Sequence, residues 1–126
     1  MATMAKSTKD SFYFLRAVEA MESDDNETAI QFLSQELDQN PTNGYAHMMV
    51  AYICYDLDSY GNALEYAQKA IKYLPKSDHA MRAATYRILG QLYLTAKDTA
   101  RTINYMELAQ KDPRFRYKYG FFVWLL

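Results

Sequence analysis

Two prolines, Pro41 and Pro75, each follow an amphipathic segment, and they stand 34 residues apart in the chain. Two pairs of alanines repeat at the same offset: Ala17 with Ala51, and Ala29 with Ala63. A fixed period of this length, with apolar residues three and four apart inside each segment, is typical of stacked helical repeats. The sequence therefore predicts an all-α chain in which each helical hairpin buries its apolar face against the next.

Each repeat contains two amphipathic runs separated by a short polar turn. The expected helices of the first two repeats cover residues 11–21, 28–37, 45–55 and 61–73. In the third repeat the period is interrupted by five extra residues, Lys76–Ala80, which we expect to lengthen its first helix. The second helix of that repeat is expected to end just before Pro113.

Polar side chains ahead of these runs are candidate helix caps. Ser7 with Asp10 three residues later suggests a capping pair for the first helix. Asp25 or Asn26 is expected to cap the second helix, and Ser77 the first helix of the third repeat.

The third repeat carries the most specific motif, Tyr86-Arg-Ile-Leu-Gly-Gln-Leu-Tyr93. Together with the alanine and proline register, it resembles the tetratricopeptide family. The resemblance covers residues 8–113, with Thr102 at a position where the family usually has alanine. It implies a right-handed superhelical solenoid of antiparallel helix pairs with about seven helices in one domain, residues 1–126. Its repeats would span residues 8–43, 44–76 and 77–113, followed by a helix over residues 114–126.

In this family the first helices of successive hairpins line a concave surface that binds peptides. Transferring that role by repeat phase gives ten candidate groove residues: Phe14, Val18, Met21, Tyr45, Met48, Tyr52, Tyr55, Arg87, Gln91 and Leu94. Tyrosine offers a large contact area at low entropic cost, and methionine adapts to irregular partners. The alternative for each residue is burial in the hairpin core. The resemblance predicts a scaffold that binds a peptide or partner protein on a groove rich in tyrosine and methionine.

Some family members grip acidic chaperone peptides with a clamp of lysine, asparagine and arginine on the inner helix faces. The matching positions here are apolar: Phe14, Val18, Met49, Ala84 and Ile88. We therefore expect a partner that presents apolar or aromatic side chains.

Residue types that carry catalysis or bind metals are scattered. His47 and His79 each lack a second ligand at metal-site spacing, and Cys54 has no recognisable base. The four glycines form no phosphate loop. The sequence predicts neither an enzyme nor a cofactor or metal site. The formal net charge of −1 also argues against a nucleic-acid partner.

The end of the chain is apolar, over residues 121–126. We expect the chain to be a fragment of a longer protein, cut inside a fourth repeat. The alternative is a homo-oligomerisation element that forms a homodimer through this helix. The candidate self-association residues are Phe121, Phe122, Trp124 and Leu125.

The preceding residues alternate basic and aromatic side chains. Arg114, Arg116 and Lys118 are interleaved with three aromatic residues, a pattern that can bind single-stranded RNA. Three charges are a weak signal, so an RNA-binding helical repeat is the lesser alternative.

The remaining expectations concern location. The first ten residues contain no apolar signal region, and no apolar run reaches the roughly 18 residues of a membrane helix. Cys54 is the single cysteine, which is compatible with a reducing compartment. A cytoplasmic protein without a membrane partner is therefore expected.

Overall fold

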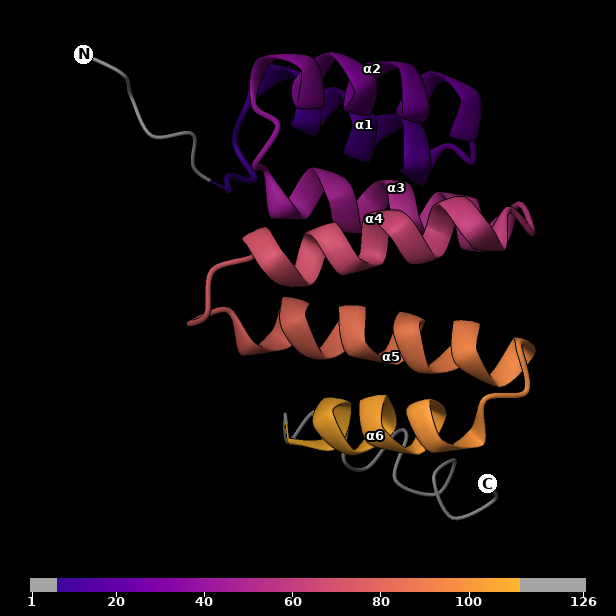
Figure 1. The fold of residues 1–126 in the computed structure, drawn as a ribbon. Coiled ribbons are helices and arrows are strands. Elements are labelled where there is room, and N and C mark those ends of the chain that lie inside the picture. The colour runs from indigo at the N-terminus through magenta and orange to yellow at the C-terminus, as the bar shows by residue number, and fades with distance from the viewer. Residues whose placement is uncertain (1–6, 112–126) are drawn as a thin grey trace.

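The structure, a computed structural model, describes residues 7–111. Within that range the chain is all-α and contains six helices and no strand (Figure 1). The helices are α1 (Phe12–Glu22), α2 (Asn26–Gln39), α3 (Gly44–Asp56), α4 (Tyr60–Tyr73), α5 (His79–Thr95) and α6 (Thr99–Gln110). The seventh helix expected over residues 114–126 lies outside the described residues. No helix in the described part is both long and apolar enough to cross a membrane.

The helices pack as three successive hairpins, α1 with α2, α3 with α4, and α5 with α6. In Figure 1 the hairpins follow one another from the top of the view to the bottom. Contacts of α2 with α3, of α4 with α5 and of α3 with α5 join each hairpin to the next. The prediction of an all-α chain of packed helices is confirmed.

Alanines allow the helices to approach closely. The four alanines of the repeat, Ala17, Ala29, Ala51 and Ala63, have no exposed surface. Larger side chains then fill the space on either side of them, including Leu33, Ile53, Leu89 and Met106, none of which is more than 1% exposed. Small residues at the crossing point and large ones beside it produce dense packing between helices.

Each hairpin turns in the same way. The residue after the C-cap of the first helix has a positive φ in all three hairpins: Asp24 (57°), Asp58 (60°) and Lys97 (62°). The next backbone N–H donates to the carbonyl five residues earlier, at 2.8–2.9 Å. This is the Schellman arrangement, which uses otherwise unpaired carbonyls at a helix end. The residue that donates this bond is also the N-cap of the following helix, so one short turn ends one helix and starts the next.

The first helix begins later than the capping pair at Ser7 and Asp10 predicts. Its N-cap is Ser11, whose Oγ accepts a hydrogen bond from the Phe14 amide at 3.2 Å. Ser7 instead accepts a bond from the amide of Gly44 at 2.7 Å. The prediction was wrong because the Ser7 hydroxyl bonds to a segment that is distant in the sequence.

The other caps differ less from expectation. Of the two residues predicted as caps of α2, Asp25 is the one that caps it, by accepting from the Thr28 amide at 3.1 Å, and Asn26 is the first residue of the helix. Ser77 does not cap α5; its neighbour Asp78 does, by accepting from the Met81 amide at 3.1 Å. A carboxylate satisfies the first-turn amides as well as a hydroxyl does, so the two neighbouring residues could not be separated by type alone.

A buried polar network joins the first hairpin to the start of α3. Asn43, the N-cap of α3, has no exposed surface, and Glu36 of α2 is 3% exposed. The Asn43 amide donates to Glu36 Oε2 at 2.7 Å and to the carbonyl of Thr8 at 3.0 Å, and its oxygen accepts from the Tyr45 amide at 3.2 Å. The Ser11 hydroxyl donates to the other Glu36 oxygen at 2.7 Å. The carboxylate of α2 thus connects the N-caps of α1 and α3.

Candidate peptide-binding groove

A hollow of about 360 Å³ lies between α1 and α3, with the start of α5 at one side. Its size falls within the range of ligand-binding clefts. The residues that line it are Lys9, Phe14, Val18, Met21, Tyr45, Met48, Met49, Tyr52 and Met81. Six of the ten groove residues proposed from the repeat phase are therefore together in one place: Phe14, Val18, Met21, Tyr45, Met48 and Tyr52.

Two aromatic rings form the floor of this groove. Phe14 and Tyr45 are each only 6% exposed, and their rings meet edge to face with centroids 6.4 Å apart. Both belong to the core shared by the first two hairpins. Their contribution to a bound partner is therefore a rigid apolar surface.

A hydrogen bond fixes the Tyr45 ring at one end of the groove. Its hydroxyl donates to Asp78 Oδ2 at 2.5 Å. Burial, this bond and the negative charge of Asp78 together raise the pKa of Tyr45 to about 12. Lys9 stands at the rim, with its Nζ 4.0 Å from the same carboxylate oxygen and 5.2 Å from the centre of the Tyr45 ring. The rim therefore carries one cation over an otherwise apolar lining.

The walls of the groove are flexible thioethers. Met21, Met48, Met49 and Met81 are all half-buried, and so is Val18. Long unbranched side chains in this state can change rotamer to fit a ligand, because part of their surface is not fixed by packing. Tyr52, at 41% exposure, is the most accessible aromatic side chain of the lining.

Four of the candidate residues do not line the groove: Tyr55, Arg87, Gln91 and Leu94. All four are half-buried. The Tyr55 ring packs against Tyr60, with centroids 5.7 Å apart. The other three lie on α5, which begins within the segment inserted before the third repeat. Met81 directly follows the inserted residues and lines the groove, where the repeat phase predicted no groove residue.

Lys9 and Met81 line the groove although the repeat phase did not place them there. Met49 also lines it, and the sequence had placed Met49 on the inner helix face only as a position that matches the chaperone clamp. Met49 is next to the predicted Met48 and lies in an apolar helix, so both could face the groove. Lys9 lies in the segment before α1 and reaches the groove from there. No periodic signal could have found it.

His47 is a packed aromatic residue. It is 5% exposed, and its ring lies 5.7 Å from those of Tyr66 and Tyr73. Its Nε2 lies 2.7 Å from the Pro41 carbonyl, and a carbonyl can only accept, so Nε2 carries the proton. Burial lowers the pKa of His47, and the charge of Lys69 adds to this effect, whereas the Pro41 bond opposes it.

Cys54 is half-buried, and burial raises the pKa of its thiol. Among residues 7–111 there is no group of three His, Cys, Asp or Glu side chains that could hold a metal ion. The candidate self-association residues Phe121, Phe122, Trp124 and Leu125 lie outside the described part of the chain. The same is true of the basic residues Arg114, Arg116 and Lys118.

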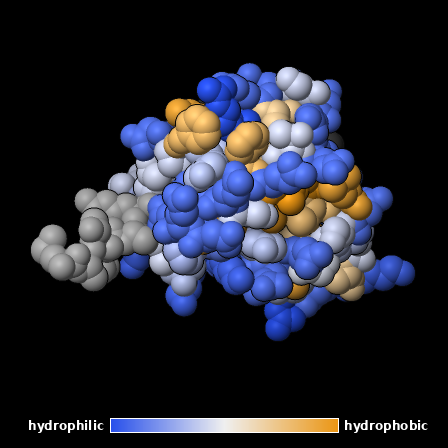
Figure 2. Space-filling view, turned by 90° about the horizontal axis from the view of Figure 1, so that it is seen from above, coloured by the Kyte–Doolittle hydropathy of each residue, from blue (hydrophilic) through white to orange (hydrophobic). Residues whose placement is uncertain are grey.

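Apolar side chains also reach the surface elsewhere. Figure 2, which views the molecule from the α1–α2 end, shows them in separate groups among hydrophilic neighbours. Phe12 and Leu15 of α1 are 62% and 48% exposed. They do not line the groove.

No model of a known protein family matches the chain, and no curated protein matches its sequence.

Proposed function

We propose that this chain is a non-catalytic protein-interaction module whose groove between α1 and α3 binds an apolar segment of another polypeptide. The observation that carries the proposal is the convergence of four methionines and three aromatic residues around one hollow. Aromatic and methionine side chains are enriched where proteins bind other proteins.

The groove favours a particular kind of peptide. Its rigid floor, Phe14 and Tyr45, suits one large apolar or aromatic side chain, which the methionine walls can enclose. Lys9 has a side chain that is 57% exposed, so its ammonium can also meet a carboxylate next to that anchor. The preferred ligand is therefore an aromatic or long aliphatic residue with an acidic neighbour.

We also propose that the three hairpins form a right-handed superhelical solenoid of the tetratricopeptide type. Two features support it. The positive-φ residues of the first two turns, Asp24 and Asp58, are separated by the 34-residue period, and the alanines at that period are fully buried. In such a stack, adjacent first helices line one face, which is the position of the groove between α1 and α3.

The experiment selects ligands and then tests the groove with matched tyrosine variants. Peptides that bind the full chain are selected from a displayed random library, and their dissociation constants are measured. Tyr52 and Tyr60 have nearly equal exposure, 41% and 38%, but only Tyr52 lines the groove. Tyr52→Ala is expected to weaken binding about tenfold or more, as loss of an interface tyrosine does. Tyr60→Ala is expected to leave it unchanged.

If the two substitutions weaken binding equally, or neither does, the groove is not the binding site. Failure of the library to yield any peptide that competes for one common site would also count against a peptide-binding function.

A further inference from the structure

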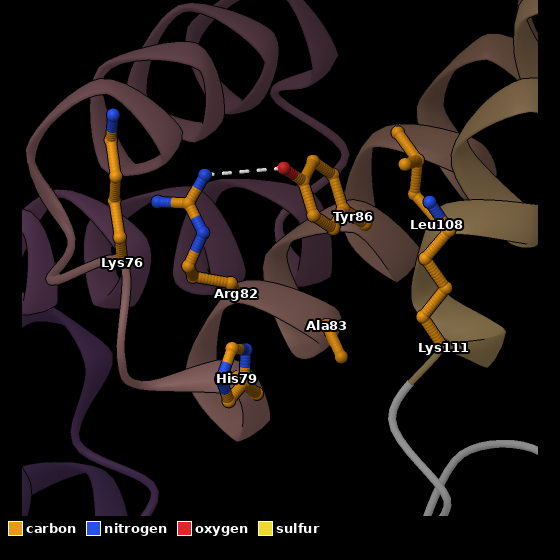
Figure 3. A pocket seen from close by; sticks show the side chains of 7 residues that line it. All are labelled: Lys76, His79, Arg82, Ala83, Tyr86, Leu108 and Lys111. Atoms are coloured by element: carbon orange, nitrogen blue, oxygen red, sulfur yellow. Dashed lines mark hydrogen bonds between the residues drawn. The ribbon is translucent and has the colours of Figure 1, made fainter.

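A second, larger hollow of about 620 Å³ lies between α5 and α6, beside the connection from α4 (Figure 3). The residues that line it are Lys76, His79, Arg82, Ala83, Tyr86, Leu108 and Lys111. It is separate from the groove, and neighbouring residues of α5 face the two hollows: Met81 the groove and Arg82 this pocket.

The charged side chains of the described residues that line this pocket all have one sign. Three cationic side chains line it, and they come from different parts of the chain: Lys76, Arg82 and Lys111. The imidazole of His79 also lines the pocket. No acidic residue of the described range lines the pocket. None of the ion pairs found between residues 7 and 111 involves these basic residues. Cations that line one pocket without an acidic side chain among the described lining residues repel one another, and an anion bound in the pocket would relieve that repulsion.

The Arg82 guanidinium is fixed in place before any ligand binds. Its Nη1 donates to the carbonyls of Ile71 and Leu74, at 3.0 and 3.2 Å, and its Nη2 donates to the Tyr86 hydroxyl at 3.2 Å (Figure 3). The Tyr86 ring is in turn stacked on Tyr105, with centroids 6.2 Å apart. A charge held in this way loses little entropy on binding a ligand.

We propose that this pocket binds a phosphate monoester. A phosphate dianion carries a charge of about −1.5 to −2 at neutral pH and three acceptor oxygens, which suits a pocket lined by three cations better than one carboxylate does. Tyr86, Ala83 and Leu108 provide an apolar wall for the organic group of the ester. The ester is either a small free molecule or a phosphorylated side chain of a polypeptide.

The test measures the affinity of the full chain for three probes: inorganic phosphate, phenyl phosphate, and a short peptide that contains phosphotyrosine. We expect phenyl phosphate to bind about fivefold more tightly than inorganic phosphate, because its ring stacks on the apolar wall. A phosphopeptide that binds more tightly than phenyl phosphate would identify a polypeptide as the source of the ester. Equal affinity would identify a small free ester.

Two double variants with the same change in net charge locate the site. Lys76→Gln with Lys111→Gln removes two lining cations and is expected to weaken phenyl phosphate binding about tenfold. Lys69→Gln with Lys72→Gln, on α4 and outside the pocket, is expected to leave it within about twofold. The proposal is overturned if neither ester binds, if inorganic phosphate binds as tightly as phenyl phosphate, or if both double variants lose the same affinity. All four lysines are at the surface or half-buried, and circular dichroism checks that both variants keep the helical fold.

Discussion

Asn43 is the residue whose loss should most clearly reveal how the first hairpin is attached to the second. Asn43→Ala removes the cap of α3 and leaves the Glu36 carboxylate without one of its buried donors. Loss of an N-cap costs about 1 kcal/mol. Loss of a buried hydrogen bond to a charged group costs about 1.5–3 kcal/mol. The expected decrease in the free energy of unfolding is therefore about 3 kcal/mol.

Urea unfolding followed by circular dichroism measures this loss. With a slope of about 1.5 kcal/mol per molar urea, the midpoint should fall by about 2 M. Asn104→Ala is the matched control, because Asn104 is exposed on α6 and should change the midpoint little.

A reciprocal pair of substitutions separates the hydrogen bond from simple packing. Asn43→Asp places a carboxylate against Glu36 and is expected to be at least as damaging as Asn43→Ala. Adding Glu36→Gln to Asn43→Asp reverses the direction of the bond, from position 36 to position 43, and should recover about 1 kcal/mol. The reasoning fails if Asn43→Ala costs under about 1 kcal/mol, or if the second substitution lowers stability further.

Four further predictions concern the stability of the fold. A Cβ on Gly44 would lie 2.4 Å from the backbone nitrogen of Leu74, so Gly44→Ala should cost more than about 2 kcal/mol in thermal unfolding. Gly61 has open space around it, so Gly61→Ala should instead stabilise α4 by about 0.5–1 kcal/mol. Lys97→Gly should raise the melting temperature, because it relieves a positive φ of 62° that costs a side chain about 1 kcal/mol. The pKa of Tyr45 is raised to about 12 in the folded chain, against 10.0 ordinarily, so its contribution to stability is complete below pH 10 and is lost as the pH rises to 12. In alkaline urea titrations, Tyr45→Phe should therefore lose less stability across that window than the parent chain; an identical slope would contradict the assignment.

The helical pairing could be predicted because it depends on local periodicity. Ala17 and Ala51 are small, buried residues at positions where helices pack closely. The 34-residue offset between them does not depend on where each helix is predicted to begin or end. The residue at which each helix starts was harder to predict from the sequence. Ser11 and Asp78 compete with polar neighbours of equal capping ability, and the choice depends on contacts from distant segments.

The turns and the buried network show a second limit. Asp24, Asp58 and Lys97 adopt positive φ, yet none is the glycine that usually marks such a position. Glu36 is buried although glutamate is usually exposed, because Ser11 and Asn43 bond to it from elsewhere in the chain. These features depend on tertiary contacts, and a repeat period contains no information about them.

Part of the lining of the candidate groove could be predicted, because it depends on the repeat period. The first two hairpins are regular, so Met48 and Tyr52 lie in the same hollow as the first-repeat residues with which the repeat phase grouped them. The insertion before α5 breaks the phase, so Gln91 does not line the groove and Met81 does.

The most direct test of the proposed groove is methyl NMR of the full chain with labelled methionines, titrated with a selected peptide. Met21, Met48, Met49 and Met81 line the groove, whereas Met106 is fully buried in α6 away from it. The proposal predicts that the methyl signals of the four groove methionines shift in proportion to peptide bound, while that of Met106 stays in place. Saturating peptide that leaves the groove signals unchanged would contradict it.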